Sequence, residues 1–216
     1  MEKESFKDKK PVIYTAAVLM AVIWGLSFIV LQVALTELSV IQSMAMRWTM
    51  AACVCLVLIC TKVLKVSYKG KPLKLLLFAV FLQPCLYAML EALGVALTTS
   101  TESAVLIALV PVVVVLLSIV FLRQHIALLG IAGIVIAFSG VVVTAVFSKD
   151  FSLGGKWIGY LALSGAVMTG ALFTLASKKI SKDGHFSATE ITVAMSFGGA
   201  IFYNLMSLFL GNGLAP

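Results

Sequence analysis

The sequence has little charge for its length. Only 12% of its 216 residues are Asp, Glu, Lys or Arg, and 62% are apolar. Soluble globular domains carry about 25% charged and about 45–50% apolar residues. Several apolar runs reach the ~20 residues that an α-helix needs to cross a bilayer. The composition therefore excludes an ordinary soluble domain and predicts a multi-spanning helical membrane protein.

Residues that bind metals or form disulfides are also scarce. The chain has two histidines and four cysteines, and three of the cysteines share one apolar run (Cys53, Cys55 and Cys60, with Cys85 apart). Their spacing matches no zinc pattern, and a disulfide framework would place cysteines in loops. The sequence also pairs no nucleophile with a base and has no glycine-rich phosphate loop. We therefore expect no cofactor and no metal, and we expect that the protein is not an enzyme.

The apolar runs predict an all-α fold, a polytopic membrane helix bundle of about seven transmembrane helices. Short connections separate the runs, so consecutive helices should pack antiparallel. The lipid bilayer is then one partner of the chain. The expected spans are 12–35, 40–61, 75–97, 103–122, 126–147, 157–177 and 188–210.

The basic residues are distributed unevenly between the two ends of these spans. Thirteen lie in the N-terminal tail and in the loops after the second, fourth and sixth spans, whereas only Lys149 and Lys156 lie on the opposite side. Basic loops stay in the cytoplasm. The pattern predicts a cytoplasmic N-terminus. We expect the membrane to be a bacterial cytoplasmic (inner) membrane. Because the net charge of +7 comes from these loops, we expect no nucleic acid as a partner.

Two segments of the chain match at a constant offset of 145 residues. They share Ala21/Ala166, Val22/Val167, Gly25/Gly170 and Phe28/Phe173. Five spans separate the copies, so the copies run in opposite directions, as in the inverted repeats of transporters. We therefore predict a five-helix repeat over 11–147 and the start of a second repeat over 155–216. Because the second repeat has only two of its helices, we expect that the chain is a fragment and that roughly three helices are missing.

Two charged side chains lie inside apolar spans. Glu91 is in the third span and Arg47 in the second, each about 10 Å from the outer end at 1.5 Å per residue. At a helix centre each would cost roughly 2.5–3.5 kcal/mol to insert, so contact with lipid is disfavoured. An ion pair between them, or a shared wet cavity, would lower this cost. We predict a substrate or proton site; the alternatives are a structural ion pair and an arginine that extends to the interface.

Two prolines interrupt spans near their middle. Pro84 and Pro111 each remove a helical hydrogen bond, and broken helices at this depth line binding sites in many transporters. Gln83 adds an amide beside the first proline, and Trp24 and Ser27 lie on one face of the first span. Together with the two charged residues, these five form the predicted substrate translocation path. The alternative is that they only kink or pack helices.

Two further patterns predict local structure. Thr99-x-x-Glu102 and Ser187-x-x-Glu190 both match the capping box at a helix start. Small residues that permit close helix approach recur on two spans: Gly133, Ala137, Gly140 and Thr144 on the fifth, and Gly155, Gly159, Ala166, Gly170 and Thr174 around the sixth. We expect the small residues to pack within the bundle, with dimerisation as the alternative.

Several motifs follow one another in a recognisable order. Trp24-Gly-Leu-Ser-Phe28 lies in the first span and Arg47 in the second. The stretch from Tyr87 to Pro111 forms a hairpin around a Thr/Ser turn, and the stretch from Gly130 to Gly140 is rich in glycine. In this order and spacing they resemble the EamA family of the drug/metabolite transporter superfamily, over nearly all of residues 11–210.

The chain departs from that family at two points. Members usually carry a glutamate in the short fourth–fifth loop, where this sequence has Gln124. They also have ten helices in two five-helix repeats, whereas this sequence predicts seven helices. The resemblance implies a secondary carrier of small metabolites or drugs, often an exporter, that works by alternating access. We therefore expect a small-molecule substrate, and either a homodimer or a missing second half. The alternatives are a membrane assembly or scaffold protein without its own substrate, and an intramembrane enzyme.

Overall fold

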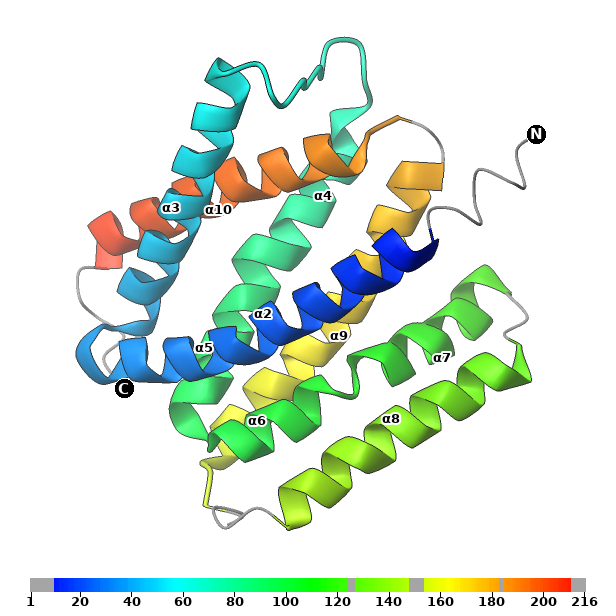
Figure 1. Cartoon of the computed structure of the whole chain (residues 1–216). Helices are drawn as coiled ribbons and strands as arrows, with labels where there is room; N and C mark the ends of the chain where they lie inside the picture. Colours follow the sequence, from blue (N-terminus) through cyan, green and yellow to red (C-terminus); the bar gives the residue numbers. More distant parts are fainter. Residues whose placement is uncertain (1–9, 124–126, 148–153, 183–184, 211–216) are drawn as a thin grey trace.

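The computed structural model describes residues 10–123, 127–147, 154–182 and 185–210. These residues form helices and no strand, as Figure 1 shows. The helices are α2 (Lys10–Glu37), α3 (Val40–Cys60), α4 (Leu73–Val80), the π-helical segment η1 (Phe81–Tyr87), α5 (Ala88–Leu97), α6 (Ser100–Ile107), α7 (Val110–Leu122), α8 (Leu128–Val146), α9 (Trp157–Lys182) and α10 (Ala188–Leu210). Six helical stretches among them are long and apolar enough to cross a membrane, and α8 is a shorter apolar helix. The predicted all-α membrane bundle is confirmed, and the protein is a multi-pass membrane protein.

Both spans that contain a central proline are irregular, but in different ways. The third span runs through α4, η1 and α5 without a break in the helix, and Pro84 lies inside the wider π-helical turns of η1. The fourth span is divided into α6 and α7, where the N–H of Leu109 donates to the carbonyl of Leu106 in a tighter turn. Pro111 lies in the first turn of α7, where its missing N–H would have no helical partner anyway.

Helix α9 packs against the third and fourth spans and occupies the centre of the bundle. Its close contacts use glycine. A Cβ built on Gly94 of α5 would lie 2.4 Å from Cγ of Leu163, and one built on Gly159 would lie 2.8 Å from Cβ of Leu97. Without a hydrophobic driving force between helices in lipid, such close backbone approach supplies the packing energy. The predicted role of the small residues in bundle packing is confirmed for α9.

The same expectation is wrong for the glycines of α8. A Cβ built on Gly133 or Gly140 would meet no atom within 4 Å among the described residues. Helix α8 lies at the edge of the bundle, where it packs against α6, and most of its described side chains are exposed. A stripe of small residues therefore permits close packing without requiring it.

Within the described residues, capping boxes begin three of the helices. The two that the sequence predicts, Thr99/Glu102 and Ser187/Glu190, are both formed. A third, Ser39/Gln42, begins α3. Sequence reasoning missed it because the returning side chain is glutamine, although the capping box admits Gln as well as Glu.

Both capping glutamates also fasten a neighbouring segment. The carboxylate of Glu102 accepts hydrogen bonds from the Tyr160 hydroxyl at 2.5 Å and from the N–H of Gly154 at 3.1 Å, which tie α6 to the start of α9. The carboxylate of Glu190 binds Nζ of Lys71 through both oxygens at 2.7 Å, which ties α10 to the loop before α4. The bundle is thus held at its helix ends as well as along its centre.

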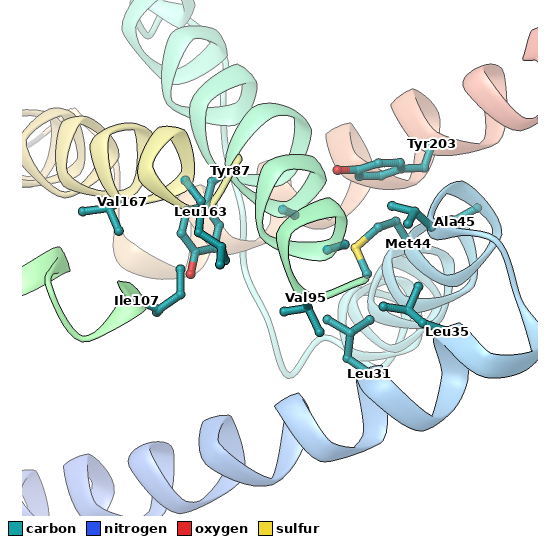
Figure 2. Close-up of a cluster of buried hydrophobic side chains, with 14 residues drawn as sticks. Leu31, Leu35, Met44, Ala45, Tyr87, Val95, Ile107, Leu163, Val167 and Tyr203 are labelled. Carbon is teal, nitrogen blue, oxygen red and sulfur yellow. The ribbon is translucent and has the colours of Figure 1, made fainter. Parts of the chain in front are cut away.

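A cluster of buried apolar side chains joins α2, α3 and α10 to this centre. Figure 2 shows Leu31 and Leu35 of α2 near Met44 of α3, and Tyr203 of α10 with its hydroxyl directed at the third span. Beyond these contacts α2 is mostly exposed. One face of the third span therefore remains open toward α2 and α3, and this is where a pocket forms.

Candidate functional site

Five of the seven predicted path residues line one pocket of about 350 Å³. They come from three spans: α2, α3, and the third span with η1 and α5. The five are Trp24, Ser27, Arg47, Gln83 and Glu91. Trp48, Tyr87 and Ala88 also line this pocket. The volume lies within the range of about 300–1,000 Å³ that is usual for small-molecule sites.

Glu91 is held by a residue that the predicted path did not include. Glu91 is only 3% exposed, and the hydroxyl of Tyr87 donates to Oε1 of its carboxylate at 2.6 Å. Residues four apart face each other on a helix, so Tyr87 in the last position of η1 meets Glu91 one turn later in α5. The spacing of four from the buried acid was the signal that could have identified Tyr87.

Arg47 does not form the ion pair that the sequence left open. Within the described residues its guanidinium makes no hydrogen bond and no ion pair. Arg47 and Glu91 instead share the walls of the same pocket. An ion pair or a shared cavity could lower the cost of placing these two charges in the membrane. Of these two arrangements, the structure has the shared cavity.

Trp48 adds a second donor without an acceptor beside Arg47. Its ring lies over Gly199 of α10, where a built Cβ would be 2.6 Å from the indole Cδ2. The indole Nε1 is buried and has no hydrogen-bond partner among the described residues. A buried polar group without a partner is costly and calls for an explanation. Sequence reasoning missed Trp48, although its place beside Arg47 inside an apolar span was a signal.

The two prolines do not line this pocket. Pro84 is buried within η1, next to Gln83, and Pro111 is exposed at the start of α7. Pro84 acts on the pocket through the helix that carries Gln83 and Tyr87. A direct part for either proline in a translocation path stays a prediction.

A second, apolar pocket of about 510 Å³ continues from the first between α2 and α3. The two share Ile23, Ser27 and Arg47. Most of the remaining lining is aliphatic, with Ser43 as an added polar side chain. The first pocket, which holds Arg47, Gln83 and Glu91 and is called the polar pocket from here on, therefore has an apolar extension toward the α2–α3 turn.

The sequence matches a known family over most of this architecture. A model of the EamA-like transporter family matches residues 12–146, which include every residue of the polar pocket. The chain belongs to the EamA-like transporter family. Its family is one of membrane transporters and not of enzymes, and transport implies small-molecule substrates and a lipid bilayer.

Known relatives of this EamA-like chain are described as transporters. The chain is 26% identical over 209 residues to "Uncharacterized transporter YcxC" of Bacillus subtilis (strain 168), covering 94% of this chain and 64% of that protein. It is 30% identical over 196 residues to "Uncharacterized transporter YetK" of the same organism, covering 89% of this chain and 58% of that protein. An "Uncharacterized transporter" of Archaeoglobus fulgidus is 33% identical over 121 residues, covering 56% and 42% of the two chains. The chain thus spans roughly three fifths of the Bacillus relatives, and no solved structure matches it.

Some sequence predictions fall outside the described residues. These include Gln124, where EamA members usually carry a glutamate, and Lys149 on the predicted outer side. The lysines of the N-terminal tail at positions 3, 7 and 9 lie outside them as well. The charge asymmetry behind the predicted orientation therefore remains a property of the sequence.

Proposed function

We propose that this protein is a secondary carrier that exports a small metabolite or drug across a bacterial cytoplasmic membrane by alternating access. The polar pocket is its substrate site. One observation supports this most: among the described residues the Arg47 guanidinium has no acceptor, although it lines a pocket that also holds the buried Glu91. Ionisable groups inside membrane spans mark substrate or ion pathways in most membrane proteins.

The chemistry of the lining indicates what the substrate must offer. An acceptor group on the substrate, such as a carboxylate, would pair with the Arg47 guanidinium. A donor group would pair with Glu91, whose Oε1 is already bound to Tyr87. The apolar pocket between α2 and α3 would take an aliphatic or aromatic part of the molecule. Such a substrate satisfies polar groups that otherwise lie buried or unpaired.

Transport in proteoliposomes tests the proposal on the full-length protein. The assay measures uptake of a panel of radiolabelled amino acids and of the dye ethidium. It compares two pocket variants, each with one matched control variant. Arg47→Gln is paired with Arg123→Gln, which changes the other arginine of the chain, and Glu91→Gln is paired with the exposed Glu37→Gln. We expect Arg47→Gln and Glu91→Gln each to lower transport at least about tenfold, the effect of about 1.4 kcal/mol of lost interaction, while both controls keep it. Unchanged transport in both pocket variants would refute the substrate site.

We also propose that Glu91 carries a proton that couples transport to the proton gradient. Its burial beside Tyr87 within a membrane span supports this role. Transport into liposomes should then rise when a pH gradient is imposed, and Glu91→Gln should abolish the rise. Transport that is indifferent to the gradient would contradict proton coupling while leaving the substrate site intact.

The orientation and the two repeats complete the proposal. The N-terminus lies in the cytoplasm, and residues 11–147 and 155–216 are the first repeat and the start of its inverted copy. Single cysteines at Lys65 and Lys156, in a background without other cysteines, would be labelled by an impermeant thiol reagent from opposite sides. Labelling of both from the same side of intact cells would overturn the topology.

A further inference from the structure

The π-helical segment leaves one backbone carbonyl without a helical donor. The N–H of Ala88 donates to the carbonyl of Gln83, five residues back. In an α-helix its partner would be Pro84, four residues back. Since α5 continues with the ordinary spacing of four, the change from five to four passes over one carbonyl in the turn that begins with Pro84 and Cys85.

A tyrosine from another helix fills this position. Tyr203 of α10 is 0% exposed, and its hydroxyl lies 2.8 Å from the carbonyl oxygen of Pro84 and 3.1 Å from that of Cys85. Figure 2 shows the ring reaching from α10 with the hydroxyl toward the third span. Inside a membrane no water replaces such a donor, so a backbone group must be satisfied within the protein.

The segment that Tyr203 stabilises carries two walls of the polar pocket. Gln83 and Tyr87 both belong to η1 and both line the pocket. Tyr87 in turn donates to Glu91 in α5. One residue of an α-helix corresponds to a rotation of about 100°, so a return of η1 to α-helical spacing would turn Gln83 relative to Glu91 by about that angle. The geometry of the pocket therefore depends on the π-helical turn.

We infer that Tyr203 is a positioning residue for the substrate pocket, acting through the main chain of Pro84 and Cys85. The inference rests on the proposed function of that pocket as a substrate site. Tyr203 itself does not line the pocket, and it lies outside residues 12–146, which match the family. The pocket between α2, α3 and the third span is thus held in shape by a residue of α10.

The test uses the carboxyl ¹³C resonance of Glu91 in full-length protein in lipid nanodiscs, assigned by its absence in Glu91→Gln. It compares Tyr203→Phe, Tyr87→Phe and the double variant with the wild type. Tyr68→Phe is the matched control. Like Tyr203, Tyr68 donates its hydroxyl to a main-chain carbonyl of another segment, here that of Glu190 in α10 at 2.7 Å, and this bond lies away from the pocket. Each variant loses one hydroxyl and keeps its ring.

We expect the Glu91 resonance of Tyr203→Phe to shift in the same direction as that of Tyr87→Phe, because both disturb the Tyr87–Glu91 hydrogen bond. The double variant should shift no further than the larger single shift, and Tyr68→Phe should match the wild type. A wild-type resonance in Tyr203→Phe, or an equal shift in Tyr68→Phe, would overturn the inference. If Tyr203→Phe does not fold, Pro84→Ala takes its place, because it restores the N–H that favours an α-helical turn. A wild-type resonance in Pro84→Ala would then overturn the inference.

This experiment separates the inference from the proposed function, because it needs no substrate. A shifted resonance together with normal transport in both Arg47→Gln and Glu91→Gln would show that Tyr203 positions Glu91 and that the pocket is not the substrate site. An unshifted resonance together with lost transport in Glu91→Gln would keep the site and reject the role of Tyr203.

Discussion

The contact of Leu163 with Gly94 gives the sharpest prediction about stability, one turn from Glu91. Leu163 of α9 is fully buried, and a Cβ added to Gly94 would lie 2.4 Å from its Cγ and 2.6 Å from its Cδ2. Carbon atoms in contact prefer separations of about 3.5–4.0 Å, so the added methyl group would overlap Leu163 by about 1 Å. Overpacking of this kind costs about 1–3 kcal/mol, which is the loss that we expect for Gly94→Ala.

The second half of this prediction is a double-mutant cycle. Leu163→Ala alone removes the side chain over Gly94 and should cost about 2–5 kcal/mol, as large-to-small core changes do. In Gly94→Ala with Leu163→Ala, the new methyl group occupies part of the emptied space. The double variant should therefore be more stable than the sum of the single effects predicts, by about 1–3 kcal/mol.

Reversible unfolding in mixed micelles with SDS, followed by tryptophan fluorescence, measures these differences. Gly25→Ala is the control, because a Cβ at Gly25 in α2 meets no atom within 4 Å. Alanine is favoured over glycine in a helix by roughly 0.5–1 kcal/mol, so this variant should lose no stability. Strictly additive effects of Gly94→Ala and Leu163→Ala would refute the packing argument.

Two further predictions concern contacts of α10. Lys71→Gln breaks the ion pair in which Nζ of Lys71 contacts both carboxylate oxygens of Glu190. Because a partly exposed ion pair contributes at most about 1 kcal/mol, the melting temperature should fall by about 2–4 °C. The fall should be smaller in high salt, which screens the two charges. Lys65→Gln in the same loop should not change it, and an equal fall in both variants would contradict a specific ion pair. Gly199→Ala should displace the Trp48 indole, since the new Cβ would lie 2.6 Å from Cδ2. We therefore expect altered tryptophan emission. Transport should be at least tenfold weaker, an effect of about 1.4 kcal/mol. Wild-type emission in Gly199→Ala would show that the indole is not held there.

Most of the fold could be predicted because helix positions in a membrane protein depend on local composition. The predicted third span, 75–97, agrees with 73–97 in the structure, and the two predicted capping boxes are formed. The sixth span was expected to end at residue 177, whereas α9 continues to Lys182. Lys178 and Lys179 end the apolar run but not the helix, since lysine is a good helix former. Loss of hydropathy marks the membrane boundary and not the end of a helix.

The site was less predictable because it depends on contacts between distant segments. The charges of Arg47 and Glu91 were visible as anomalies in apolar runs, and both line the pocket. Their failure to pair could not be read from sequence, since it depends on the packing of α3 against α5. The bond of Tyr203 to Pro84 joins residues 119 positions apart. No local pattern marks Tyr203 as a partner of that proline.

The unpaired state of Arg47 has a consequence for how the protein is made. Spans enter the bilayer in the order of synthesis, so α3 with Arg47 must insert before α5 with Glu91 exists. Insertion of Arg47 then depends on the other residues of α3, an apolar helix of 21 residues, which offset the roughly 2.5–3.5 kcal/mol cost of a central arginine. Because neither charge needs the other for insertion, cells should produce Glu91→Gln and Arg47→Gln at normal levels. A variant that is present in the membrane yet inactive would then report on transport and not on biogenesis.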